Sequence, residues 1–412
     1  MTVQSIDKPS AAVWRTPLVL ILSGCLIAMV SFGPRSSLGF FLTPLSEANH
    51  WGRDVFALAL AVQNLLWGIG QPVAGAIADR FGAPRVLTVG AVLYGLGLYL
   101  MAQATTPAML ALSAGVLIGF GLSGCAFTIV VGALGKLVPA EWRSTAFGFG
   151  TAAGSFGQFL FSPLAVALNG VVGWHTTLMI FAAVLMVIVP LSLVLSAPPS
   201  HTSAFAASEQ SLRHAMAEAF AHRSYVLLVL GFFTCGFQLA FVTVHLPSYL
   251  LDRGLSAEVG GWTLATIGLF NIIGSVSVGY LGNYVPKRYI LSAIYFARAL
   301  SIAVFVLLPA SPAATLVFGA VTGLLWLSTV PPTSSLVALM FGTRWLAMLF
   351  GFAFLSHQVG GFLGVWLGGL VFDHFGTYNP VWWLSVAFGV ASAIINLPII
   401  EKPVERAAQA AA

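Results

Sequence analysis

Long apolar stretches alternate with short polar segments along almost the whole chain. Each stretch is about as long as the roughly 20 apolar residues that a helix needs to cross the hydrocarbon core of a bilayer. Within stretches such as 86–104 and 178–195 the apolar residues are continuous rather than alternating, which excludes the strands of a membrane β-barrel. The pattern predicts twelve membrane-spanning helices, at 16–45, 54–78, 85–104, 108–136, 144–169, 174–196, 224–251, 257–281, 288–309, 312–340, 345–371 and 380–401.

The composition agrees with an all-α membrane protein. Hydrophobic residues make up 58% of the 412 residues and charged residues 7%, whereas a soluble domain carries about 25% charged residues. The first apolar stretch is too long for a signal peptide and is not followed by an A-x-A cleavage pattern, so we expect it to remain as the first helix. Cys25, Cys125 and Cys235 fall inside predicted helices, where a thiol behaves as a small apolar residue. We therefore expect no disulfide, no metal site and no cofactor.

Basic residues are distributed unevenly among the predicted loops. If both termini are cytoplasmic, thirteen of the 17 Lys and Arg residues fall on the cytoplasmic side. Because positive charge is enriched in cytoplasmic loops, we expect this orientation, in the bacterial inner membrane. The net charge of +5 then reflects topology, and we expect the lipid bilayer rather than a nucleic acid as the macromolecular environment.

A polar segment rich in Ala, Ser and His divides the chain into two parts of six predicted helices. We expect an N-terminal half at 1–196, a cytoplasmic linker at 197–223 and a C-terminal half at 224–412. The halves resemble each other, because a shift of 204 residues places Gly115 and Gly119 on Gly319 and Gly323. Parallel six-helix repeats are a plan of transporters that bind their substrate between the repeats near the middle of the membrane.

The loop after the second predicted helix contains a recognisable motif, Gly75-Ala-Ile-Ala-Asp79-Arg80-Phe-Gly82-Ala-Pro-Arg85. It resembles the G-x-x-x-D-R-x-G-x-R motif of the major facilitator superfamily, and the resemblance implies twelve helices in two pseudo-symmetric halves. It also implies that Asp79, Arg80 and Arg85 form a conformational latch, which holds the halves together in one state and releases them in the other. The alternative is that the arginines only anchor the loop on the cytoplasmic side.

Four further segments resemble the bacterial branch of the monocarboxylate transporter family. In the first predicted helix, Gly33-Pro34-Arg35-Ser36-Ser-Leu-Gly-Phe40-Phe41 is similar to that family's P-K-S-x-x-x-F-F pattern. The resemblance implies that Arg35 supplies the cation for an anionic substrate and for its proton coupling. The other segments are 244–254, 329–333 and 354–361. The eighth helix departs from the pattern, because Asn271 and Ser275 stand where eukaryotic members have an Asp and an Arg.

Charged and polar side chains inside the predicted helices are the candidates for substrate contact, because intramembrane charge is costly and usually functional. Arg35 and Arg298 are the deeply placed cations, and His245 and His357 can relay protons. The alternatives are a snorkelling anchor for Arg35, backbone hydrogen bonds for Arg298 and ties between helices for the histidines. The remaining candidates for substrate binding are polar or aromatic: Asn64, Trp67, Gln158, Gln238, Asn271, Trp326 and Gln358.

No acidic residue lies in the middle of a predicted helix, because all 12 fall in tails, loops or helix ends. Transporters of cations, and antiporters of drugs against protons, commonly need such a carboxylate. Cations without acids in the core therefore favour an anionic substrate. The sequence has no phosphate-binding loop, no H-E-x-x-H and no acidic pair, so we expect no enzymatic activity.

These observations predict a secondary transporter, expected to be a monomer, that moves a small organic anion by alternating access. The family resemblance implies a monocarboxylate and coupling to protons. Two alternatives stay open: an antiporter or exporter of another small amphipathic solute, and a transporter-like sensor of a ligand. Short loops and tails without a signalling domain favour a transporter over a sensor.

Overall fold

The computed structural model describes residues 16–196, 212–342 and 345–404, and these residues form helices and turns without a β-strand. The elements before the linker are α1 (Pro17–Ser36), η1 (Leu38–Phe41), α2 (Leu42–Asn49), α3 (Arg53–Phe81), α4 (Ala83–Ala102), α5 (Pro107–Leu110), η2 (Ala111–Leu117), α6 (Ile118–Gly124), α7 (Phe127–Leu137), α8 (Ala140–Leu185) and α9 (Ile188–Val194). The elements after it are α10 (Leu212–Ala221), α11 (Arg223–Asp252), α12 (Ala257–Leu281), α13 (Lys287–Leu307), α14 (Pro312–Leu325), α15 (Val330–Phe341), α16 (Leu346–Phe375) and α17 (Asn379–Asn396).

Ten segments among the described residues are long and apolar enough to cross a membrane. One of them, Ala152–Val194, makes two crossings, because Gly173 inside α8 has φ 78° and ψ 162° and breaks the helix. Glycine adopts this positive φ without the steric cost that a Cβ would bring. An unbroken α8 of 46 residues would be about 69 Å long, more than twice the thickness of the bilayer core. Counting the two parts of this segment separately and adding α17, a helix of 18 residues, gives the twelve helices that were predicted.

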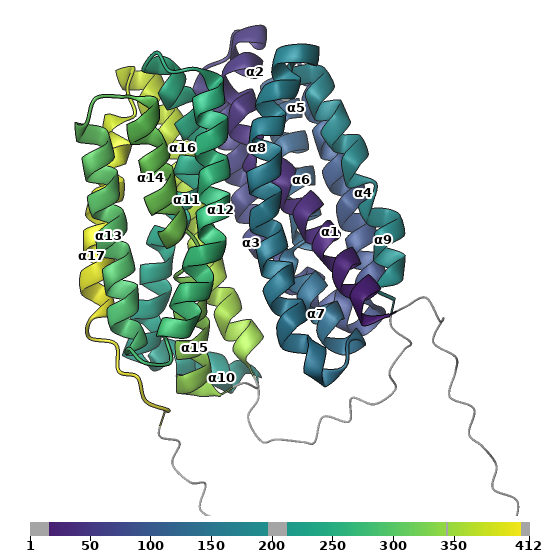
Figure 1. Ribbon diagram of the computed structural model, residues 1–412, viewed down its shortest axis with the longest axis vertical. Coiled ribbons are helices and arrows are strands. Elements are labelled where there is room, and N and C mark those ends of the chain that lie inside the picture. Colours follow the sequence, from purple (N-terminus) through teal and green to yellow (C-terminus); the bar gives the residue numbers. More distant parts are fainter. Residues whose placement is uncertain (1–15, 197–211, 343–344, 405–412) are drawn as a thin grey trace, which may run out of the picture.

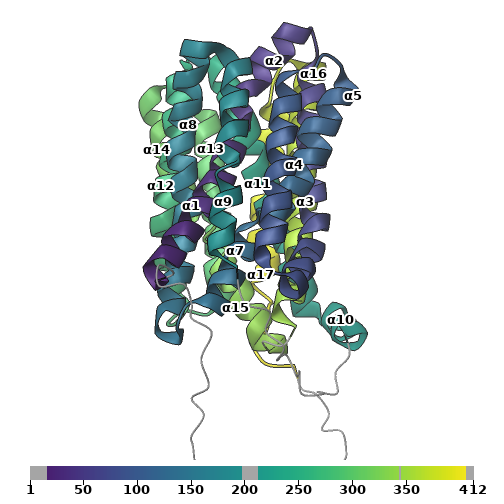
Figure 2. The same ribbon diagram turned by 90° about the vertical axis from the view of Figure 1, so that its right-hand side faces the viewer.

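The helices stand in two bundles side by side (Figure 1). Elements α1 to α9 make one bundle, and α11 to α17 make the other. The start of α1 and the end of α17 lie at the end of the molecule that carries α10, in both Figure 1 and Figure 2. We call this the linker end, and we call the opposite end, which carries α2, the far end.

The bundles contact each other mainly through two helix pairs, α3 with α16 and α8 with α12. A Cβ on Gly268 of α12 would lie 2.7 Å from the carbonyl oxygen of Ser155 in α8. A Cβ on Gly369 of α16 would lie 2.9 Å from the carbonyl oxygen of Arg53 in α3. Lipid tails are as apolar as the helices, so small residues that allow close packing of this kind stabilise the association of membrane helices.

Four predicted helices are interrupted in the structure, and the sixth is divided between α8 and α9 by a turn at 186–187. The first changes from α1 to a 3-10 turn, η1, and then to α2, while the fourth stops at 125–126 and the tenth at 326–329. A shift of 203 residues places the first of these two gaps inside the second, so they are equivalent positions of the repeat. The apolar pattern continues across each gap, which is why it did not reveal them. The predicted linker also contains a helix, α10, which packs on α11.

Candidate functional site

The side chain of Arg35 lies between the two bundles, at the point where α1 ends. Its Nη2 donates a hydrogen bond of 2.7 Å to Oδ1 of Asn64 in α3. Asn64 is oriented for this contact because its Nδ2 donates to the carbonyl oxygen of Leu60, one turn earlier. The guanidinium also lies over the ring of Trp67, 4.7 Å from its centroid. Asn64 and Trp67 are three residues apart, so one face of α3 holds the cation from two sides.

The Nε of Arg35 is buried and has no hydrogen-bond partner. A buried N–H without a partner costs about 1–3 kcal/mol, and more when the group is charged. Arg35 borders a small cavity that has room for about one water molecule. The other residues that line it come from η1, α3 and α11: Leu38, Leu60, Gln63, Asn64, Ala240, Thr243 and Val244. The site therefore has one cation, three uncharged polar side chains, apolar walls and no acid.

A row of aromatic rings leads from Arg35 to the opposite bundle. Trp67 contacts Phe354 of α16 edge to face, with 5.4 Å between the ring centroids. Phe354 stacks on His357, one turn later, at 5.7 Å and an interplanar angle of 7°. Nδ1 of His357 lies 3.1 Å from Oε1 of the neighbouring Gln358. The structure thus places His357 and Gln358 on the α16 side of the same region as Arg35.

His245 of α11 has a different environment. It is fully buried, and its Nε2 lies 2.8 Å from the carbonyl oxygen of Val365 in α16. Its ring also packs on Tyr378 and Phe241. A Cβ on Gly368 would lie 2.4 Å from this ring, so glycine there makes room for it. The structure places His245 between α11 and α16 and not in the cavity beside Arg35.

Arg298 of α13 binds the interrupted tenth helix. Its guanidinium donates to the carbonyl oxygens of Leu325 and Trp326, where α14 ends, and its side chain is almost fully buried. These carbonyls have no partner within the helix and form the negative end of its dipole. Nη1 is also 3.4 Å from Oε1 of Gln238, whose own amide donates to the carbonyl oxygen of Ser385. The structure therefore gives Arg298, Trp326 and Gln238 partners within the second bundle.

Asn271 and Gln158 join the two bundles along α8 and α12. Nδ2 of Asn271 donates to Oγ of Ser155 at 2.8 Å, and its Oδ1 accepts from the backbone N–H of Leu327 at 2.9 Å. Gln158 donates to the carbonyl oxygen of Leu264 at 3.1 Å. Of the eleven candidate substrate-binding residues, the structure brings Arg35, Asn64 and Trp67 into direct contact and adds His357 and Gln358 through Phe354.

Sequence reasoning did not place Thr243 in the site. Thr243 shares one face of α11 with Ala240 and Val244, at helical spacing, and lines the cavity with them. Its hydroxyl donates to the carbonyl oxygen of Leu239 at 2.7 Å. A threonine inside an apolar helix carries no signal that distinguishes a cavity-lining position from such an internal bond.

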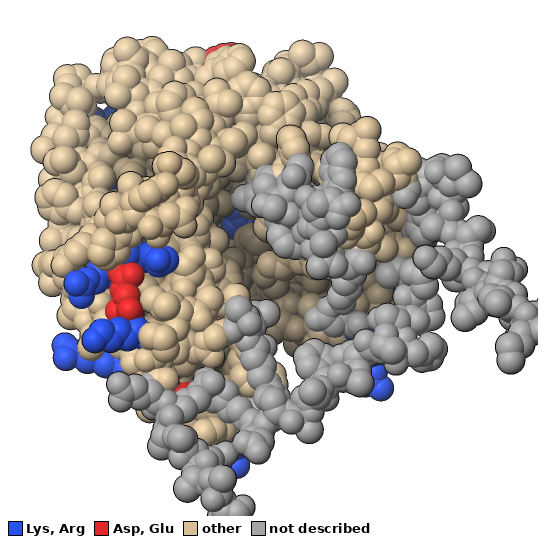
Figure 3. All heavy atoms as spheres, turned by 60° about the horizontal axis from the view of Figure 1, so that its bottom comes forward, with Lys and Arg blue, Asp and Glu red and all other residues tan. Residues whose placement is uncertain are grey.

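The loop motif lies at the linker end. The side chain of Asp79 lies outside the described part of the structure, so the predicted latch with Arg80 and Arg85 stays a prediction. Arg80 and Arg85 are exposed, and the guanidinium of Arg80 lies 5.3 Å from the ring centroid of Phe81. Figure 3 shows this end of the molecule, which is hollowed between the bundles, with a basic side chain visible inside the hollow.

Most of the sequence matches the model of a known family. The model described as the Major Facilitator Superfamily matches residues 24–365. The chain belongs to this superfamily. Its members are transporters of small molecules and not enzymes, so the predicted family, fold and absence of an enzymatic role are confirmed.

Individual relatives within the superfamily cover nearly the whole chain. YcxA of Bacillus subtilis, an uncharacterised transporter of the superfamily, is 30% identical over 392 residues, which cover 91% of this chain and 93% of its own. Monocarboxylate transporter 13 of Bos taurus is 25% identical over 406 residues, which cover 92% and 89%. The crystal structure of the nucleoside transporter NupG superposes with a TM-score of 0.76 at 14% identity, covering 92% of this chain and 99% of its own. At that identity, the likeness to NupG concerns the fold alone.

Proposed function

We propose that this superfamily member is a secondary active transporter that moves a small monocarboxylate together with protons by alternating access. The observation that carries the proposal is the unpartnered Nε of Arg35, which borders a cavity between the bundles without an acidic residue in its lining. The 25% identity to a monocarboxylate transporter along nearly the whole chain supports the same substrate class.

A carboxylate matches the open side of Arg35. A guanidinium binds a carboxylate through two parallel N–H groups, and such charge-assisted bonds are about twice as strong as neutral ones. In the structure Nη2 donates to Asn64, and Nε has no partner. A substrate carboxylate takes Nε and one terminal N–H, and so displaces or shares the Asn64 contact. Leu38, Leu60 and Val244 then face a short apolar tail.

The remaining cavity is too small for even a short acid in the described conformation, so the bundles must separate for the substrate to enter. We assign the halves 1–196 and 224–412 as the two moving bodies. We assign the linker end and both termini to the cytoplasmic side of a bacterial inner membrane, and the excess of basic residues at this end supports the orientation. With the hollow at the linker end, we assign this conformation as inward-facing, and we propose that the transporter acts as a monomer (Figure 3).

His357 is the protonatable group that we assign to coupling. It is half-buried and lies one stacked ring beyond Trp67, whereas His245 is fully buried against the α16 backbone. A proton on His357 adds positive charge near the anion and favours its binding. Proton and substrate anion therefore bind together, which is the basis of symport.

Counterflow in proteoliposomes tests the proposal. Vesicles loaded with an unlabelled short monocarboxylate are expected to accumulate the labelled acid, whereas an amine or a dicarboxylate of similar length does not drive exchange. Exchange of an amphipathic solute without a carboxylate would support the exporter alternative. Binding of an acid without any exchange would support the sensor.

A further inference from the structure

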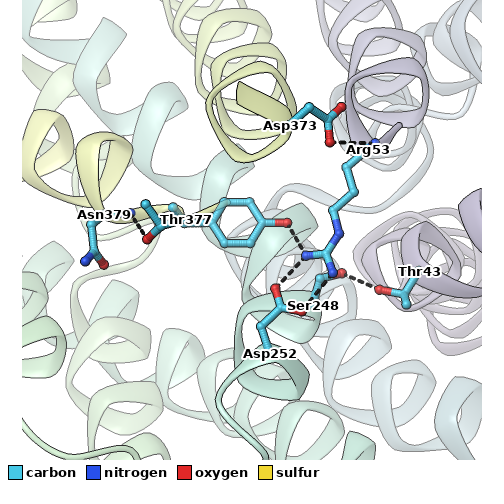
Figure 4. A network of polar contacts seen from close by, with 8 residues as sticks. Thr43, Arg53, Ser248, Asp252, Asp373, Thr377 and Asn379 are labelled. Atoms are coloured by element: carbon cyan, nitrogen blue, oxygen red, sulfur yellow. Dashed lines mark hydrogen bonds and ion pairs between the residues drawn. The ribbon is translucent and has the colours of Figure 1, made fainter. Parts of the chain in front are cut away.

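The far end of the molecule is closed by charged contacts between the two bundles. Arg53, the first residue of α3, forms an ion pair with Asp252, the last residue of α11. Both terminal nitrogens of Arg53 take part, with bonds of 2.6 and 2.8 Å to the two carboxylate oxygens. Figure 4 shows the Arg53 side chain reaching from its own bundle to Asp252 in the other.

The arginine is also held by aromatic rings of the second bundle. Its guanidinium lies 3.8 Å from the ring centroid of Phe372, and its Nη1 donates to the hydroxyl of Tyr378 at 2.8 Å. Only 15% of the Arg53 side chain is exposed, against 33% for Asp252. An ion pair on an open surface contributes little, so this partial burial and the paired geometry are what make the contact effective.

A second contact uses the backbone at the start of α3. The N–H groups of Arg53 and Asp54 donate to the Asp373 carboxylate, at 3.1 and 2.7 Å. The first N–H groups of a helix lack internal partners, and the residue before α3 is Gly52, which has no side chain to cap them. Asp373 belongs to α16, so the cap of α3 comes from the opposite bundle. A Cβ on Gly52 would lie 2.6 Å from Asp373 Oδ2, so glycine there leaves room for the carboxylate.

These contacts exist only while the far end is closed. Each of them joins α3 to the other bundle, at α11, at α16 or at Tyr378, the residue before α17. Within α3, the carboxylate of Asp54 also lies beside the first N–H groups. When the bundles separate at this end, Arg53 and the two carboxylates face water and the cap of α3 is lost. Interactions made in one of two conformations shift the equilibrium towards that conformation.

We infer that Arg53, Asp252 and Asp373 form a far-end latch that holds the transporter in the conformation closed at the far end and open at the linker end. The inference rests on the alternating access of the proposed function but not on its substrate. The far-end latch lies at the opposite end of α3 from Asp79. The same helix therefore carries, at each end, charged residues that we expect to stabilise one of the two conformations.

The test measures the separation of the bundles at the far end without any substrate. Spin labels are attached at two exposed positions, Ala48→Cys in α2 and Ala310→Cys in the α13–α14 loop. The native cysteines, Cys25, Cys125 and Cys235, are replaced by alanine. In proteoliposomes, Arg53→Gln is expected to raise the population with a long label distance by about fivefold, the low end of usual coupling between sites. The exchanged pair Arg53→Asp with Asp252→Arg is expected to restore part of the short-distance population.

Arg253→Gln is the matched control, because it removes the same charge one residue beyond Asp252. Arg253 is exposed and contacts Tyr249 of its own helix, so its loss is expected to leave the distances unchanged. If Arg53→Gln gives folded protein with the wild-type distances, the latch is overturned; Asp252→Asn provides the same test where Arg53→Gln does not fold. Counterflow on the same vesicles reports separately on the monocarboxylate proposal.

Discussion

At the scale of single residues, the two arginines inside the membrane have different partners. Arg298 has carbonyl oxygens around its guanidinium, whereas Arg35 has one amide oxygen, one aromatic face and an N–H without a partner. A guanidinium whose N–H groups all donate to the protein stabilises the fold, whereas one with an unpaired N–H can donate a hydrogen bond to a ligand. This difference supports our proposal that the substrate carboxylate binds at Arg35.

The first prediction concerns Arg35. Arg35→Gln removes the charge and is expected to weaken binding of the acid about 10- to 150-fold, which corresponds to about 1.5–3 kcal/mol for hydrogen bonds to a charged group. Arg35→Lys keeps the charge without the paired geometry and is expected to retain partial uptake. Binding by purified protein and uptake per folded molecule measure the two effects. Unchanged affinity in Arg35→Gln would rule out this role and move the prediction to Arg298.

At the scale of elements, the interrupted tenth helix is the feature with the clearest energetic requirement. The gap at 326–329 leaves backbone groups without helical partners inside the membrane, where unsatisfied groups are costly. Arg298 bonds the carbonyl side of the gap, and Asn271 bonds the N–H of Leu327. The position of α15 relative to α14 therefore depends on side chains from α13 and α12.

The second prediction follows from these bonds. Arg298→Gln is expected to lower the stability of the purified protein by about 2 kcal/mol or more, because buried carbonyls lose a charged donor. Affinity for the acid is expected to change less than in Arg35→Gln. Thermal unfolding in detergent and equilibrium binding measure the two quantities. Lost affinity at normal stability would instead indicate that Arg298 contacts the substrate.

At the scale of the whole molecule, function depends on the balance between two arrangements of the bundles. The far-end latch stabilises one arrangement through Arg53, Asp252 and Asp373. The loop motif at the linker end is expected to stabilise the other. A transporter needs both arrangements at similar free energy, because a latch that is too strong slows the change from the arrangement it stabilises to the other one.

The third prediction concerns the loop motif. Asp79→Asn is expected to leave expression and substrate affinity near normal but to slow transport, because it shifts the conformational balance. The label pair Ala48→Cys and Ala310→Cys reads the shift directly, as a larger population closed at the far end. A loss of affinity with unchanged label distances would show that the assignment of Asp79 is wrong.

The fourth prediction concerns coupling. Uptake of a monocarboxylate is expected to rise as the external pH falls, since the proton enters with the anion. Vesicles loaded with the pH indicator pyranine are expected to acidify during uptake. His357→Gln, which removes the protonatable ring, is expected to weaken this dependence, while Arg253→Gln is not. Uptake without acidification would exclude symport.

The sequence by itself determined the helical membrane fold and the family, and it named Arg35 as a candidate cation for the substrate. Membrane crossing depends on the sum of apolar residues in one segment, and that sum is local. The loop motif at 75–85 and the pattern around Arg35 are also contiguous, so they are readable without a structure. Asn64 and Trp67 were likewise foreseeable as polar or aromatic positions in an apolar helix, although their contact with Arg35 was not.

Only the tertiary structure decided which polar groups meet. Arg35 and Asn64 are 29 residues apart, Arg298 and Leu325 are 27 apart, and Arg53 and Asp252 are 199 apart. A hydropathy pattern assigns residues to a membrane helix but gives neither the rotation of that helix nor its neighbours. For the same reason the hydropathy pattern did not reveal the gap at 326–329. It also left Arg53 and Asp252 just outside the predicted helices, with no sign that they contact each other. Partner choice depends on how the bundles pack, and packing is a property of the folded chain alone.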